Sequence, residues 1–137
     1  MSNKKLLIVE DDADVCLGYR ILLRANHYDT VFAADAVGAI SEAGKQTLDL
    51  ILLDLGLPPD DGFLVLQSLQ ADPQLSTIPV IVVSGRDLHA NKERALKAGA
   101  SAFLQKPWND DELLALIRQL VSPPVDCVSS VANTAGS

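Results

Sequence analysis

Short apolar runs alternate with longer amphipathic stretches along this chain, and this alternation limits the possible folds more than any other feature. Short runs that are rich in Val, Ile and Leu and apolar on both faces are typical of strands buried inside a parallel sheet. Five runs of this kind cover residues 5–9, 30–34, 48–53, 78–83 and 102–104. They predict five buried strands, of which the second is the weakest.

The stretches between the runs carry apolar residues at helical spacing. Four of them cover residues 13–25, 62–71, 89–98 and 110–121. In the first, Val15, Gly18, Tyr19 and Leu22 fall at i, i+3, i+4 and i+7, which is the spacing of a core-facing helix stripe. Five strands alternating with five helices predict a doubly wound parallel α/β sheet with right-handed crossovers.

Composition bounds the class of protein. The chain has 137 residues, which suits one domain, and 48% of them are hydrophobic, which is enough for a core. Its formal net charge is −7 at pH 7. We expect no direct binding of nucleic acid or of an anionic membrane, because like charges repel.

The cysteines and the two ends of the chain indicate a compartment and a boundary. Cys16 and Cys127 form no CxxC pair, which fits a reducing environment. The apolar run at 6–9 is too short for a signal peptide or a membrane span, so we expect a cytoplasmic protein. Residues 122–137 are rich in Ser, Pro and small residues without periodicity. They predict a flexible tail or the start of a linker.

Polar side chains stand where the apolar runs end. Glu10 and Asp11 follow the first run, and Asp54 follows the third. Ser84 ends the fourth run and Lys106 follows the fifth. Because the carboxyl ends of parallel strands meet at one edge of a sheet, we expect these side chains to form a single site.

The residue types at this edge suit phosphoryl transfer. Crowded carboxylates repel one another, and their pKa values rise unless a cation intervenes. Mg²⁺ is the natural cation for oxygen ligands and needs only one or two carboxylates. Asp54 can then act as a nucleophile and form an acyl phosphate. Lys106 supplies a second positive charge, and the Ser84 hydroxyl can donate to a phosphoryl oxygen.

Four motifs at the strand ends resemble the receiver domain of bacterial two-component response regulators. The motifs are LLIVEDD, ILLDLGLPPDDG, VSG and LQKP, and the resemblance covers roughly residues 4–121. It implies a flavodoxin-like fold with strand order 2-1-3-4-5 and a receiver domain at residues 1–121. It also implies that a sensor histidine kinase or a histidine phosphotransfer protein supplies the phosphoryl group. The downstream effector stays unknown.

The resemblance also implies roles for single residues around the acceptor. Asp54 matches the phosphoacceptor, which also binds the metal. Asp11 matches the direct Mg²⁺ ligand, and Glu10 matches the second acid, which reaches the metal through water. Gly56 stands where the family offers a backbone carbonyl to the metal.

A second set of residues matches the switch of the family. Ser84 matches the switch hydroxyl, and Lys106 matches the amine that binds the phosphoryl group. Phe103 stands at the position of the rotating aromatic ring. The bond between Lys106 and Pro107 is expected to be cis. A phosphoryl group on Asp54 would draw Ser84 inward and let Phe103 fill the space that it leaves.

Two other functions remain possible on the sequence alone. An Asp-nucleophile phosphatase of another α/β family needs a second Asp two residues after the nucleophile, and Gly56 stands there. A pseudo-receiver that only makes protein contacts would have no need of Asp11, Asp54 and Lys106. We therefore expect a regulated binding module, with no enzymatic turnover beyond its own phosphorylation and dephosphorylation.

Several residues have structural interpretations of their own. Asp12 is expected to cap the helix that begins at residue 13. Gly99 is expected to end the fourth helix at positive φ. His27 stands at a helix-to-strand corner where we expect a strained backbone. Leu17 and Ile21 form a second apolar stripe on the first helix, which could be chance or could dock a helical partner.

Overall fold

The computed structural model describes residues 3–54, 59–85, 88–106 and 109–121, and strands alternate with helices throughout them. In chain order the elements are β1 (Lys5–Val9), α1 (Ala13–Ala25), β2 (Asp29–Ala33), α2 (Ala36–Lys45), β3 (Leu50–Asp54), α3 (Pro59–Ala71), β4 (Val80–Ser84), α4 (Leu88–Lys97), β5 (Ala102–Gln105) and α5 (Asp110–Val121). This alternation confirms the α/β class that the sequence predicts.

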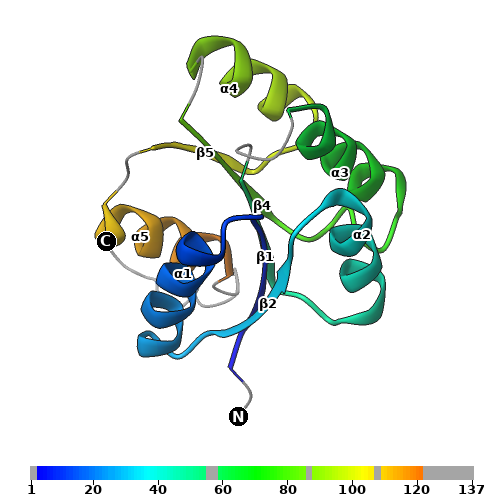
Figure 1. The fold of residues 1–137 in the computed structure, drawn as a ribbon. Coiled ribbons are helices and arrows are strands. Elements are labelled where there is room, and N and C mark those ends of the chain that lie inside the picture. Colours follow the sequence, from blue (N-terminus) through cyan, green and yellow to red (C-terminus); the bar gives the residue numbers. More distant parts are fainter. Residues whose placement is uncertain (1–2, 55–58, 86–87, 107–108, 122–137) are drawn as a thin grey trace, which may run out of the picture.

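The five strands form one parallel sheet in the order β2-β1-β3-β4-β5. Helices α1 and α5 cover one face, and α2, α3 and α4 cover the other (Figure 1). The strand order reverses beside β1, between β1 and β3, so the carboxyl ends of these strands border a crevice. The doubly wound, flavodoxin-like arrangement that we expected is confirmed.

Two apolar cores lie on the two faces of the sheet. Alternate residues of β1 divide between them, because successive side chains of a strand point to opposite faces. Leu6 and Ile8 face Tyr19 of α1, whereas Leu7 and Val9 face the helices of the other side. The central strands β3 and β4 are buried along their whole length, and β1 is buried from its second residue on, which explains why these runs are so strongly apolar.

The core stripe of α1 differs from the expected one at Gly18. This residue is exposed, and the most buried residues of the helix are Tyr19 and Leu23. Val15 and Leu22 are half-buried beside them. A leucine buries far more apolar surface than a glycine, so the helix turns Leu23 toward the sheet and leaves Gly18 outside.

Two backbone corners behave as the sequence predicts. His27, just after α1, has a φ of 69°, and Gly99, just after α4, has a φ of 109°. The expected tail at 122–137 lies outside the described residues. Among the helices that are described, none combines the length and the apolar character needed to span a bilayer.

Candidate functional site

Three polar residues are buried in the described part of the chain, and all three stand at the carboxyl edge of the sheet. Asp54 is the last residue of β3 and is 1% exposed, and Ser84 is the last residue of β4 and is 2% exposed. Glu10 follows β1 directly and is 4% exposed. Because every other buried residue in these ranges is apolar or small, this edge is a local exception that indicates a site.

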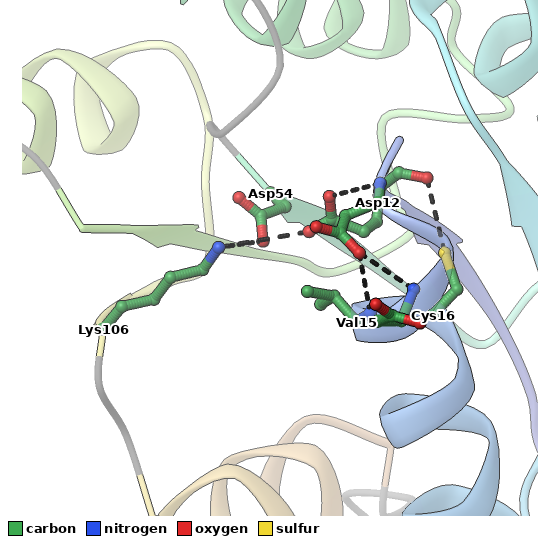
Figure 2. A network of polar contacts seen from close by, with 7 residues as sticks. Asp12, Val15, Cys16, Asp54 and Lys106 are labelled. Atoms are coloured by element: carbon green, nitrogen blue, oxygen red, sulfur yellow. Dashed lines mark hydrogen bonds and ion pairs between the residues drawn. The ribbon is translucent and has the colours of Figure 1, made fainter.

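Lys106 links two of these buried groups. Its Nζ atom lies 2.6 Å from Oδ2 of Asp54 and 4.0 Å from Oε1 of Glu10 (Figure 2). The Lys106 backbone N–H donates to the carbonyl oxygen of Ser84 at 2.9 Å, which anchors the residue just beyond β5. Its side chain keeps about a third of its surface exposed (35%), so the amine reaches the buried acids from the solvent side.

The carboxyl group of Glu10 has a strongly raised pKa. Burial is the main reason that its pKa rises to about 8, and the neighbouring Asp54 carboxyl raises it further. The backbone N–H of Asp12 donates to Oε2 of Glu10 at 3.0 Å, and this hydrogen bond lowers the pKa in part. Oε1 of Glu10 is buried and accepts no hydrogen bond from the described residues. At neutral pH, Glu10 therefore holds a proton in the metal-free protein.

The loop after β1 is held to helix α1. Asp12 caps the helix, as expected: its side chain accepts hydrogen bonds from the backbone N–H groups of Asp14 and Val15. The thiol of Cys16 donates to the carbonyl oxygen of Glu10 at 3.4 Å. Sequence reasoning missed both the Asp12 N–H and the Cys16 thiol as supports of Glu10. A backbone N–H can come from almost any residue type, so the sequence carried no signal for it.

The structure brings several of the expected site residues to one edge of the sheet. Glu10, Asp54 and Lys106 come together, and Ser84 lies at the same sheet edge beside them. Asp11 is exposed. With Glu10, it lines an open cavity of about 600 Å³ between α1 and the end of β2.

One further expected residue is described, on the fifth strand. Phe103 is half-buried against the core on the α2–α4 face. Gly56 and Pro107 lie outside the described residues, so the expected carbonyl ligand and the expected cis bond stay predictions.

The donor set suits a hard divalent cation. Two buried carboxyl groups lie beside one amine, and a buried Glu10 oxygen accepts no hydrogen bond from any described residue. In the described ranges, His, Cys, Asp and Glu side chains do not gather in threes as a ready-made metal cage. Mg²⁺ does not require such a cage, because it keeps several waters and takes one or two carboxylates. These residues therefore fit Mg²⁺.

Comparisons with known proteins agree with this geometry. The family model described as "Response regulator receiver domain" matches residues 6–118. The transcriptional regulatory protein KdpE of Mycobacterium tuberculosis is 36% identical over 116 residues, which are 85% of this chain and 50% of that protein. The response regulator PleD of Caulobacter vibrioides is 37% identical over 119 residues, or 86% of this chain and 26% of that protein. The chain thus spans half or less of these relatives.

Solved structures show the same architecture. The receiver domain of the sensor histidine kinase PA1611 from Pseudomonas aeruginosa, with a magnesium ion coordinated in its active site cleft, has a TM-score of 0.81 and 27% identity. That match covers 89% of this chain and all (100%) of the other. A putative response regulator from Chloroflexus aurantiacus has a TM-score of 0.83 at 26% identity, with the same coverage of 89% and 100%.

Proposed function

Because the chain belongs to the response regulator receiver domain family, we propose that it is switched by phosphorylation of Asp54. The observation that supports this acceptor best is the 2.6 Å contact between Lys106 Nζ and Asp54 Oδ2 at a buried strand end. A lysine at this distance places a positive charge against the carboxyl group that would act as the nucleophile. The receiver unit then occupies residues 1–121, followed by a tail or linker at residues 122–137.

The phosphoryl transfer forms one bond at phosphorus and breaks another. A carboxylate oxygen of Asp54 attacks the phosphorus of a phosphohistidine or of a small phosphodonor. The bond from phosphorus to the donor nitrogen or oxygen breaks, and the leaving group takes up a proton from solvent. The product is an acyl phosphate on Asp54, and Lys106 stays beside the new negative charge.

The remaining residues of the site serve this transfer. Ser84 offers a hydroxyl to a phosphoryl oxygen, and burial of the strand ends limits the access of water. Asp11, Glu10 and Asp54, with the backbone carbonyl of Gly56, would hold Mg²⁺. When bound, Mg²⁺ supplies positive charge that offsets the phosphoryl oxygens.

The phosphoryl group would change the surface of the protein through a switch on the outer strands. It would draw Ser84 inward at the end of β4, and the ring of Phe103 on β5 would fill the vacated space. The coupling in such switches is typically about 1–3 kcal/mol. This makes the chain a regulated binding module whose output depends on a downstream protein.

The phosphodonor is a sensor histidine kinase or a histidine phosphotransfer protein. Leu17 and Ile21 stand exposed on α1, at 52% and 62%, one turn apart, and Leu17 lines the same open cavity as Glu10 and Asp11. Beside Ile21, a groove of about 530 Å³ runs between α1 and the start of α5. An exposed apolar ridge next to a groove suits the docking of a partner helix.

Labelling with acetyl phosphate and Mg²⁺, followed by intact mass measurement, tests the acceptor. The wild type should gain one phosphoryl group per chain, and Asp54→Asn should gain none. Asp49→Asn is the matched control, because Asp49 precedes the same strand β3 at its opposite end. No labelling of the wild type would indicate a pseudo-receiver, and multiple turnover of the donor would indicate a phosphatase.

The docking surface has its own test. Replacing Leu17 and Ile21 together by Ser should slow transfer from a phosphorylated histidine protein at least about tenfold, a loss of about 1.4 kcal/mol in binding. Labelling by acetyl phosphate should stay unchanged, because the small donor needs no docking surface. Val37→Ser on α2, which removes a side chain 79% exposed, is the control and should leave both rates unchanged.

A further inference from the structure

The hydrogen bonds of Asp12 point in two directions at once. Its backbone N–H donates to Oε2 of Glu10 at 3.0 Å, toward the site. Its side-chain Oδ1 accepts from the backbone N–H groups of Asp14 at 2.8 Å and Val15 at 3.2 Å, toward helix α1. Its carbonyl oxygen accepts from the backbone N–H of Cys16 at 3.0 Å. One residue therefore connects the first turn of α1 to a buried carboxyl group (Figure 2).

We propose that Asp12 is a positioning residue for cation binding and phosphorylation, an inference that rests on the proposed function. The side chain of Asp12 fixes the loop on the helix, and the backbone N–H of the same residue then holds the Glu10 carboxyl group in one orientation. With Oε2 held by this N–H, Oε1 lies on the side of Lys106, 4.0 Å from its Nζ atom.

The rest of the loop shows why the cap matters. The backbone of Glu10 is fixed on its other side, because its N–H donates to the carbonyl oxygen of Ala33 in β2 at 3.0 Å. Asp12 itself has an extended backbone, with φ −88° and ψ 118°, so the helix does not hold it through its own conformation. The side-chain cap and the bond from Cys16 are what attach it to α1. Removing the cap leaves only the bond from Cys16 to hold in place the N–H that orients Glu10.

The chain contains a matched control for this role. Asp35 caps α2 in the same manner, with its Oδ1 accepting from the backbone N–H of Gly38 at 2.7 Å. In the described part of the chain, Asp35 forms no hydrogen bond or ion pair with Glu10, Asp54 or Lys106, so its loss removes a cap without touching the site. Asn is as good an N-cap residue as Asp, so Asp12→Asn keeps the cap and removes only the charge.

The experiment compares wild type, Asp12→Ala, Asp12→Asn and Asp35→Ala. Mg²⁺ affinity is measured by isothermal titration calorimetry, and the Mg²⁺ dependence of acetyl phosphate labelling is measured in parallel. Asp12→Ala should weaken Mg²⁺ binding about tenfold, as the loss of a residue that orients a ligand does. Its labelling should need more Mg²⁺ for half-maximal rate but reach a similar maximal rate. Asp12→Asn and Asp35→Ala should both match the wild type.

A second variant guards against a general loss of folding. Gly at an N-cap destabilises a helix only slightly, so Asp12→Gly removes the side chain while the fold persists. It should show the same weakened Mg²⁺ binding as Asp12→Ala. Wild-type affinity in Asp12→Gly, or an equal loss in Asp12→Asn, would overturn the positioning role, the latter by showing that charge alone acts. A wild type that neither binds Mg²⁺ nor becomes labelled would overturn the proposed function, and this inference with it.

Discussion

The raised pKa of Glu10 makes folding stability depend on pH in a specific direction. The group titrates near 4.5 when exposed and at about 8 in the folded, metal-free protein. Between these values the native state holds one more proton than the unfolded state, so stability is highest below the lower value and falls as pH rises through the higher one. The slope is about 1.4 kcal/mol per pH unit. From about pH 5.5 to about pH 7, the metal-free protein should lose roughly 2 kcal/mol.

Urea denaturation in a chelating buffer measures this loss. Glu10→Gln replaces the buried acid by a neutral side chain of the same shape, so its stability should stay nearly constant over this pH range. It should exceed the wild type across this range, by about 1.4 kcal/mol at pH 5.5 and by about 3 kcal/mol at pH 7, because the two match only below the lower pKa. Glu93→Gln is the control, because it removes an exposed carboxylate on α4 and should keep the wild-type slope. Equal slopes in the wild type and Glu10→Gln would refute the assignment of a buried, protonated Glu10.

Three further substitutions test other parts of the fold. Lys106→Met removes the amine 2.6 Å from Asp54 Oδ2 and should cost about 1–3 kcal/mol of unfolding free energy. An unchanged urea midpoint at neutral pH would contradict this. Gly99→Ala places a Cβ atom 2.5 Å from Cδ of Gln70 at a φ of +109°, and should cost about 1–3 kcal/mol. Gln70→Ala in the same chain should recover only part of that loss. His27→Gly relieves a φ of 69° and should stabilise by about 0.5 kcal/mol, seen as a higher melting temperature.

The sequence predicted the sheet well because burial shapes strand composition, but it placed some strand ends wrongly. The third apolar run begins at Leu48, which is buried, yet β3 begins at Leu50. Between them, the side chain of Asp49 accepts the backbone N–H of Lys5, outside the regular ladder. Asp54 is polar but pairs with Val83 as part of the strand. Hydrophobicity reports burial, whereas strand bounds follow backbone pairing, and the two differ by a residue or two at each end.

Helix α2 had no predicted bounds, and its composition explains why. The residues that it buries are Ala36, Ala39 and Ala43, which carry little hydrophobic signal. Helices α1 and α5, by contrast, have larger apolar residues and charged or capping ends, and their predicted bounds match the structure. Small residues allow a helix to lie close to the sheet, but they make its pattern weak in the sequence.

The sequence predicted the position of the site more fully than the electrostatics of its acidic groups. Strand ends of a parallel sheet share one edge, and this alone brings Glu10, Asp54 and Lys106 together. A raised carboxyl pKa was also expected, from repulsion between acids. In the structure, burial raises the pKa of Glu10 more than its neighbour Asp54 does. Burial depends on how α1 and the β1 loop cover the group, which residue spacing does not describe.

The position of the charged groups at strand ends also explains why they stay crowded together and reactive in the folded protein. Asp54 and Ser84 are held by the ladder of β3 and β4, and the Glu10 backbone is held by β2. A carboxyl group on a mobile loop would relieve crowding by turning into solvent, but the backbone that carries these groups cannot swing into solvent without breaking the buried ladder. Their shortage of positive charge can be met only by a proton, by the Lys106 amine or by a bound cation. A rigid sheet thus holds these acidic groups in an unfavourable arrangement, and the site responds to the binding of a proton or a cation.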